Sequence, residues 1–346
     1  MAADTVTAAQ RLELLCGFAD ALSDPCLILD RRSVILHRNP AAAREFPAIA
    51  PDNLLTLVLR SPALLGAIDS VRRGGGPQSV ELHQTVPNET WHSANVAPLP
   101  GGEGLLAVTL QNLTAHKRLE QLRSDFIANA SHELRTPLTS LVGFIDTLLG
   151  PAAKDEAARE RFLTIMRQQA ARMSALIDDL LSLSRIELRQ HLRPTGTVDL
   201  AQLLSDVRDG LETQAKEAGV AISVVAPAGA IVTGDSNELH EVFENLIDNA
   251  IKYGGGGGAV EVAVTPGRAG FDYTVTVADH GAGIAAEHVP RLTERFYRVD
   301  AESSRKKKGT GLGLAIVKHI VSRHRGQLTI RSKPGEGTRV EVQLQK

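Results

Sequence analysis

The chain has 346 residues, enough for two or three domains, and its 38 basic and 40 acidic residues leave a formal net charge of -2. Proteins that bind nucleic acids usually carry an excess of positive charge, so this near balance argues against DNA or RNA as a partner. Cys16 and Cys26 form no Cys-x-x-Cys pair, which predicts neither a zinc site nor a disulfide framework.

No run of about 18 uncharged apolar residues occurs in the sequence, so no membrane-spanning helix is expected. The first residues lack a basic stretch followed by an apolar one, so no secretory signal is expected either. These features predict a cytoplasmic location for the chain as given. A membrane-anchored parent protein that has lost an N-terminal segment stays open as an alternative.

The first 112 residues predict a small α+β domain with two strands, helices and then three strands. The expected elements are a helix at 8–22, strands at 25–30 and 34–36, a helix that opens at 39–40, and strands at 79–86, 90–97 and 105–110. No cluster of cysteines or histidines indicates haem or flavin. We expect His83 and His92 to be surface residues of their strands.

The stretch Ser131–Pro137 places a histidine beside a carboxylate on a predicted helix. His132 and Thr136 are one turn apart and therefore share a face. A neutral imidazole is a good nucleophile, and the carboxylate of Glu133 can hold the proton on its other nitrogen. Apolar residues before and after the motif recur at intervals of three and four, and His132 points away from that seam. Pro137 is expected to kink the helix.

The heptad pattern begins at Leu113 and ends near Leu149, where Gly150-Pro151 breaks the helix. A second amphipathic helix follows from about Glu156. Two helices joined by a short break form an antiparallel hairpin, whose core is too thin to be stable alone. Two hairpins make a four-helix bundle, so we predict a homodimer.

Asn245, Asn249, Lys252 and Tyr253 share one face of a third predicted helix. Asparagine carbonyl oxygens suit Mg²⁺, which keeps most of its waters and also binds phosphate oxygens. The ammonium group of Lys252 can neutralise phosphate charge. An asparagine on a helix is more often simply solvated, so this pattern depends on the motifs that follow it.

Two glycine motifs come next. Asp279-His280-Gly281-Ala282-Gly283-Ile284 follows a strand directly, where the carboxylate can accept a hydrogen bond from an exocyclic amine such as that of adenine. Gly309-Thr310-Gly311-Leu312-Gly313-Leu314 opens a helix and forms a phosphate cradle. Residues 299–308 between them have the composition of a mobile lid, and Lys306–Lys308 either attract phosphates or form a solvated charge run. Gly335–Thr338 predicts a supporting hairpin turn.

In this order, the motifs resemble those of the sensor histidine kinases of bacterial two-component systems, over residues 113–346. The corresponding motifs are the H box at Ser131–Pro137, the N box at Asn245 and Asn249, the G1 box at Asp279, Gly281 and Gly283, the F box at Phe296, and the G2 box at Gly309, Gly311 and Gly313. The stretches 295–300 and 314–321 look most like the phosphate-regulon sensor subgroup. Residues 23–43 and Asn112-Leu113-Thr114 resemble parts of a PAS domain, which either holds a small ligand or another sensor protein, or only dimerises and relays.

The resemblance implies a multidomain α+β architecture. A PAS-like sensor domain at 1–112 precedes a dimerising helical hairpin at 113–191 and a Bergerat-type α/β sandwich at 192–346. The sandwich would bind ATP with Mg²⁺ on Asn249 and Asn245. The residues implied in nucleotide binding are Asn245, Asn249, Lys252, Tyr253, Asp279, Gly281, Gly283, Ile284, Phe296, Arg298, Gly309, Thr310, Gly311, Leu312 and Gly313.

The family mechanism would make His132 the phosphate acceptor, Glu133 its general base and a response-regulator aspartate the final receiver. Thr136 would orient water in a phosphatase reaction on that regulator. Two alternatives remain at this stage. An ATPase or clamp on the same fold would need a glutamate where this chain has Asn245. A non-catalytic signalling scaffold would need degenerate boxes, and the boxes here are intact.

Overall fold

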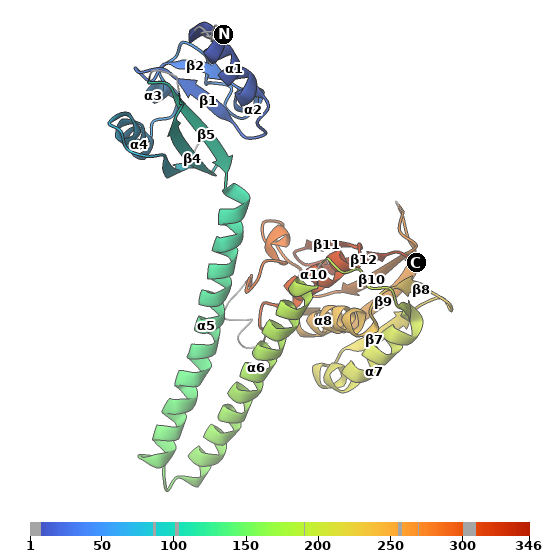
Figure 1. Cartoon of the computed structure of the whole chain (residues 1–346). Helices are drawn as coiled ribbons and strands as arrows, with labels where there is room; N and C mark the ends of the chain where they lie inside the picture. Colours follow the sequence, from blue (N-terminus) through green and yellow to red (C-terminus); the bar gives the residue numbers. More distant parts are fainter. Residues whose placement is uncertain are drawn as a thin grey trace. The chain divides into compact units, whose positions relative to one another are not determined.

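The computed structural model describes residues 8–85, 88–100, 104–189, 191–254, 258–268, 270–299 and 309–346. The chain divides into two compact units, 1–127 and 128–346, and the long helix α5 (Thr114–Leu149) passes from the first into the second (Figure 1). None of the helices in the described ranges is both long enough and apolar enough to cross a membrane.

The first unit contains a five-stranded antiparallel sheet with the strand order β2-β1-β5-β4-β3. Its strands are β1 (Cys26–Leu29), β2 (Ile35–Arg38), β3 (Gln78–Gln84), β4 (Thr90–Pro98) and β5 (Leu106–Asn112). Its helices are α1 (Ala8–Asp20), α2 (Pro40–Glu45), α3 (Leu55–Val58) and α4 (Pro62–Arg72). The expected order of elements is confirmed, except that residue 86 of the third expected run lies outside the described residues.

Strand β1 explains how the sheet is covered on both faces. Leu27 and Leu29 are fully buried in a core that also takes in side chains of α2, α3 and α4. Cys26 and Ile28 point the other way and pack with Ala19 of α1. Successive strand residues face opposite sides of a sheet, so a strand with apolar residues at every position must be covered twice.

The surface position expected for His92 is wrong. His92 is 3% exposed, and its ring nitrogen Nε2 lies 2.9 Å from Oε1 of Glu45 on α2. The strand alternation explains this, because His92 lies on the same face of β4 as Ala94 and Val96, and both are fully buried. His83 is exposed, as expected.

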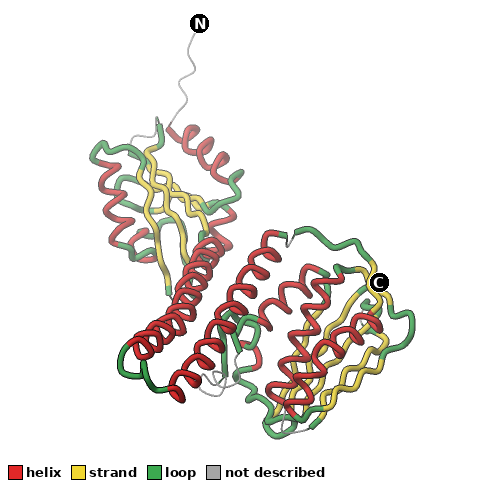
Figure 2. The backbone as a smooth tube through the Cα atoms, turned by 90° about the horizontal axis from the view of Figure 1, so that it is seen from below, coloured by secondary structure: helices red, strands yellow, loops and turns green. Residues whose placement is uncertain are grey.

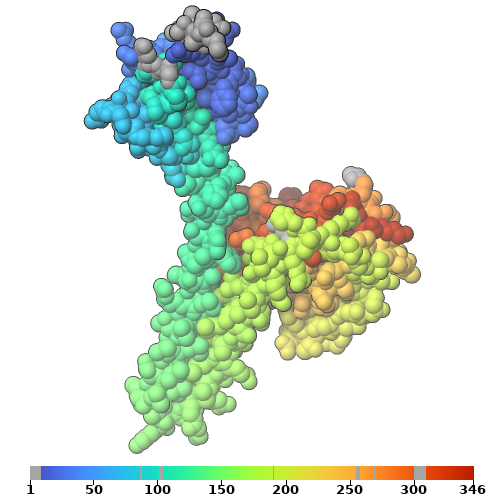
Figure 3. Space-filling view, in the orientation of Figure 1, coloured from blue at the N-terminus to red at the C-terminus, as the bar shows by residue number. Residues whose placement is uncertain are grey.

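The second unit begins with the helical hairpin. Helix α5 continues through Pro137 to Leu149, and α6 (Glu156–Leu188) starts after the break at Gly150-Pro151. The carboxylate of Asp155 caps α6 by accepting a hydrogen bond from the amide of Ala158 at 2.9 Å. The two helices run antiparallel (Figures 1 and 3), and the rings of Phe144 on α5 and Phe162 on α6 stack with their centroids 5.2 Å apart. The expected hairpin is therefore confirmed, and Pro137 does not end its helix.

The rest of this unit is an α/β sandwich. Its five-stranded sheet has the order β11-β12-β10-β9-β7, with β7 and β9 parallel and the other pairs antiparallel. The strands are β7 (Ala221–Val225), β9 (Ala259–Pro266), β10 (Tyr273–Asp279), β11 (Gln327–Lys333) and β12 (Gly337–Leu344); β6 (Thr197–Asp199) pairs with β8 (Ile231–Thr233). The helices are α7 (Leu200–Ala218), α8 (Ser236–Gly254), α10 (Gly313–Arg323) and the short 3-10 helix η1 (Val289–Arg291).

The long helices of the sandwich cover one face of its sheet (Figure 2). Helix α8 buries an apolar face that includes Val242, Phe243 and Leu246, and strands β9 and β10 oppose it with buried valines such as Val262 and Val277. Because this apolar face is buried, the polar side chains of α8 are left on its other sides. The α/β sandwich expected from the sequence is thereby confirmed.

Candidate active site

The candidate phosphate acceptor lies on the surface of the hairpin. His132 is exposed on α5, so a second molecule or module can reach its imidazole. Thr136, also exposed, donates its hydroxyl proton to the backbone carbonyl of His132 at 3.2 Å. The two side chains therefore begin one helical turn apart, as the sequence spacing predicts.

Glu133 connects the hairpin to the sandwich. Its Oε2 accepts hydrogen bonds from Arg172 of α6 at 3.3 Å and from Arg298, in the loop before the candidate phosphate cradle, at 3.2 Å. The Arg298 side chain is 11% exposed, and its Nε is buried without a hydrogen-bond partner among the described residues. An ion pair this far out of water interacts more strongly than a surface pair does.

The predicted polar face of α8 is present. Asn245 and Asn249 are half-buried, and Nδ2 of Asn245 donates to the carbonyl of Glu241 at 2.9 Å. That bond leaves the amide oxygen of Asn245 facing α10, where a Cβ on Gly313 would approach it to 2.4 Å. Gly313 is thus required by the close contact between the two helices. Lys252 is held by the carboxylate of Asp248, one turn earlier, at 2.5 Å.

The carboxyl group of Asp279 lies at the end of β10. Its Oδ1 accepts hydrogen bonds from the amides of Gly281 at 2.9 Å and Thr338 at 3.3 Å. Burial raises the pKa of this carboxyl, and the two backbone donors oppose that rise. The turn that follows needs glycine at 283, because φ is +67° there and a Cβ would lie 1.9 Å from the carbonyl oxygen of Lys333.

The remaining predicted nucleotide residues flank this turn. The amide of Ile284 donates to Oγ of Ser332 at 2.8 Å, and Leu312 is fully buried ahead of α10. The amide of Phe296 donates to the carbonyl of Gly311 at 2.8 Å, which connects the predicted F box with the predicted G2 box. Tyr253 is 39% exposed, and a Cβ on Gly309 would lie 3.0 Å from its hydroxyl. Lid residues 300–308, with Lys306–Lys308, lie outside the described residues.

Sequence reasoning missed several residues of α6 that contact these motifs. Oδ2 of Asp179 accepts a hydrogen bond from the hydroxyl of Thr310 at 2.6 Å, and burial raises the pKa of this carboxyl. Arg295 pairs with Glu187, and Nε2 of His319 lies 3.8 Å from the same carboxylate. The helical periodicity of α6 identifies only its apolar stripe, so no local signal marks these polar partners.

The donor set fits a magnesium nucleotide. Two asparagines on one helix face carry amide oxygens, which are hard ligands of the kind that would suit Mg²⁺, and Mg²⁺ needs few protein ligands because waters and phosphate oxygens complete its shell. The described residues contain no group of three or more His, Cys, Asp or Glu side chains arranged to hold a metal by themselves. Lys252 and Arg298 lie in the same unit and are the cations that would neutralise phosphate charge there.

Two family models match the chain. Residues 122–189 match the His Kinase A (phospho-acceptor) domain, and residues 234–346 match the histidine kinase-, DNA gyrase B-, and HSP90-like ATPase domain. The histidine kinase ThkA, solved in complex with the response regulator protein TrrA, has a similar fold, with a TM-score of 0.50 at 17% identity. That likeness covers 95% of this chain and 97% of ThkA.

Curated relatives of the chain are sensor kinases as well. The phosphate regulon sensor protein PhoR of Pseudomonas aeruginosa is 40% identical over 229 residues, which are 66% of this chain and 51% of PhoR. The sensor protein kinase WalK of Staphylococcus aureus is 37% identical over 242 residues, which are 70% of this chain and 58% of WalK. The chain thus spans about half the length of the curated relatives it matches. With its phospho-acceptor domain followed by its ATPase domain, the chain belongs to the two-component sensor histidine kinases.

Proposed function

We propose that this protein is a protein-histidine kinase that phosphorylates His132 from magnesium ATP. The free ring nitrogen of His132 forms a bond to the γ-phosphorus while the bond between that phosphorus and the β,γ-bridging oxygen breaks, so ADP leaves. Glu133 accepts the imidazole proton that becomes acidic as the N–P bond forms. The carrying observation is that Glu133, beside an exposed His132, is already hydrogen-bonded to Arg298 of the nucleotide module.

The sandwich holds the nucleotide. Asp279 accepts a hydrogen bond from the adenine amine. The two backbone amides that donate to its Oδ1 hold the carboxylate in place for this bond. Asn249 and Asn245 would hold Mg²⁺, which would neutralise phosphate charge when bound. Lys252 and Arg298 provide positive charge at the γ-phosphate end of the nucleotide. Tyr253, Ile284, Phe296 and the turn from Gly281 to Gly283 pack around the nucleotide, and the cradle from Gly309 to Gly313 borders its phosphates.

The phosphoryl group then passes from His132 to an aspartate of a response regulator. The fold shared with ThkA, a kinase crystallised with its response regulator, supports this partner class. Exposure of His132 on the hairpin leaves it accessible to a receiver domain. The exposed hydroxyl of Thr136, one turn away, supports a second activity, in which it orients a water against the phosphoaspartate of the regulator.

The hairpin forms a homodimer in this proposal. Leu138, Val142, Ile145 and Leu149 of α5 are between 41% and 79% exposed, although their spacing of four, three and four marks a helix seam. Leu163 and Leu181 of α6 are each more than half exposed as well. A second hairpin would cover this apolar surface and complete a four-helix bundle.

We also propose that the chain has three domains, with limits at 112/113 and 191/192. The N-terminal domain is a PAS domain that senses an input, and its strand order β2-β1-β5-β4-β3 with helices on both faces supports this assignment. A hydrogen bond fixes the C-terminal end of this domain on strand β4, because the amide of Trp91 donates to the hydroxyl of Thr114 at 3.0 Å.

Incubation with γ-labelled ATP and Mg²⁺ tests the kinase proposal. We expect label on the protein that is labile in acid, stable in base and absent from His132→Ala. Release of free phosphate without protein label would favour an ATPase or clamp. Such enzymes need a glutamate as general base at the position where this chain has Asn245. Neither product would indicate a non-catalytic scaffold.

A further inference from the structure

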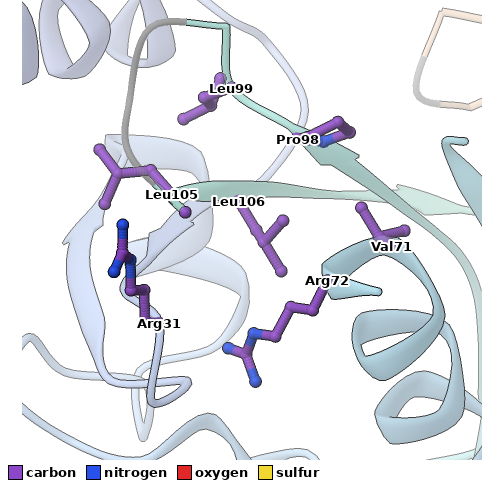
Figure 4. A pocket seen from close by; sticks show the side chains of 8 residues that line it. Arg31, Val71, Arg72, Pro98, Leu99, Leu105 and Leu106 are labelled. Carbon is purple, nitrogen blue, oxygen red and sulfur yellow. The ribbon is translucent and has the colours of Figure 1, made fainter. Parts of the chain in front are cut away.

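The first unit contains a cavity that the kinase mechanism does not use. Its volume is about 480 Å³, and it lies between the turn after β1, the C-terminal end of α4 and the facing ends of β4 and β5 (Figure 4). Small-molecule sites typically have volumes of roughly 300–1,000 Å³, so this one can hold a compact ligand. Its lining includes Arg31, Val71, Arg72, Leu99, Leu105 and Leu106.

Arg72 gives the cavity a fixed, incompletely paired cation. Its Nη2 donates to the carbonyl of Asp30 at 3.0 Å and to Oγ of Ser33 at 2.9 Å, so the guanidinium group is held in place. Its Nε is buried and has no hydrogen-bond partner among the described residues. A buried donor without an acceptor is unfavourable, and a guanidinium group binds carboxylates through neighbouring N–H groups.

The rest of the lining selects for an apolar group. Leu99 and Leu105 are half-buried, and Leu106 is 2% exposed, so aliphatic surface faces the same space as the arginines. No carboxylate is among the described residues that line the cavity. A single water could pair with the guanidinium group, but a water occupies only about 30 Å³ and would leave the aliphatic wall facing solvent.

We propose that this cavity binds a small organic carboxylate with an aliphatic tail. The carboxylate pairs with the guanidinium group of Arg72, and the tail packs on Leu99, Leu105 and Leu106. The inference does not depend on the kinase activity, because the site lies wholly within the first unit and binding is measured without nucleotide.

Isothermal titration of the full chain tests this with hexanoate, acetate, hexanol and inorganic phosphate as probes. Hexanoate is expected to bind at one site per chain. Acetate lacks the tail and hexanol lacks the charge, so each is expected to bind at least about tenfold more weakly. Phosphate is expected not to compete with hexanoate. The absence of hexanoate binding, equal binding of hexanol, or effective competition by phosphate would overturn the proposal.

Two arginines at the end of α4 provide a matched pair of variants. Arg72→Gln is expected to weaken hexanoate binding by about tenfold or more, whereas Arg73→Gln, at an exposed position outside the lining, is expected to leave it unchanged. Because Arg72 also holds the turn after β1, a second variant guards against misfolding. Leu105→Trp fills the cavity without touching Arg72, and retained hexanoate binding in that variant would exclude this site.

Discussion

Oε2 of Glu133 lies 3.2 Å from Nη2 of Arg298, 165 residues further along the chain. In this arrangement the proposed general base and the proposed γ-phosphate cation are paired with each other. Arg298 cannot contact a phosphate fully while it bonds Glu133, and Oε2 of Glu133 is occupied by the donors of two arginines. Turnover therefore requires this pair to separate or to be shared with the nucleotide.

Glu133→Gln is expected to slow phosphorylation of His132 by about a hundredfold, because an amide cannot accept the imidazole proton. The initial rate of phosphohistidine formation at saturating ATP measures this, and the affinity for ATP is expected not to fall, because the substitution removes the charge that pairs with Arg298. Glu160→Gln, at an exposed position on α6, is the control. A Glu133→Gln protein with the normal rate would remove Glu133 from the mechanism.

Asp179→Asn is expected to tighten ATP binding by roughly three- to tenfold. The carboxylate of Asp179 contacts Thr310 in the phosphate cradle and interacts electrostatically with Lys252, so its negative charge opposes that of the phosphates. An asparagine keeps an acceptor for the Thr310 hydroxyl but removes the charge. Titration with a fluorescent ATP analogue measures the affinity.

The neighbouring Asp178 provides the comparison for that experiment. It is exposed on α6, so Asp178→Asn is expected to leave nucleotide affinity unchanged. Equal effects of the two substitutions would mean that only the overall charge of the hairpin matters, and weaker binding in Asp179→Asn would show that this side chain supports the site.

Thr136→Ala is expected to abolish dephosphorylation of the regulator while autophosphorylation stays within about twofold. Among the described residues the hydroxyl bonds only a carbonyl of its own helix, and it is exposed, so the cost in folding free energy should be within about 0.5 kcal/mol. Thr139→Ala is closely matched, because its hydroxyl bonds the carbonyl of Arg135 at 3.0 Å on the same helix. Loss of phosphatase activity in both variants, or in neither, would argue against a role for Thr136.

The stability of the sandwich is expected to fall as the pH drops below about 6.5. Nδ1–H of His324 donates a hydrogen bond to the carbonyl of Ile320 at 2.8 Å, and Nε2 accepts a hydrogen bond from the amide of Asp235 at 3.0 Å. Because one ring nitrogen donates and the other accepts, the buried ring is neutral. Burial lowers the pKa of His324, and the pKa of His319 is also lowered, chiefly by burial. At these two histidines the unfolded state therefore binds more protons, so their contribution to stability rises with pH through this window.

Intrinsic fluorescence can follow this unit separately. The three tyrosines, Tyr253, Tyr273 and Tyr297, all lie in the second unit, and Trp91 lies in the first. The urea midpoint reported by tyrosine is expected to be lower at pH 5.5 than at pH 7.5, and His324→Gln should reduce that difference. His116→Gln, at an exposed site, should not. An unchanged pH dependence in His324→Gln would show that other groups control it.

The sequence alone determined the elements and the order of the chemical motifs. The hairpin break at Gly150-Pro151 and the start of α2 at Asn39-Pro40 depend on local chemistry, since Oδ1 of Asn39 accepts the amide of Ala42 at 2.8 Å. The shared face of Asn245 and Asn249 follows from helical geometry. His92 could also have been placed, because the period of two in β4 groups it with Ala94 and Val96.

Only the tertiary structure decided which charged groups meet. Glu133 contacts Arg172 and Arg298, and Asp179 contacts Thr310, across separations of 39, 165 and 131 residues. Such pairs depend on how helix faces and loops pack after their apolar sides are buried, and local periodicity carries no information about that packing. The same holds for the cavity beside Arg72, whose walls come from segments that are distant in the sequence and adjacent only in the folded unit.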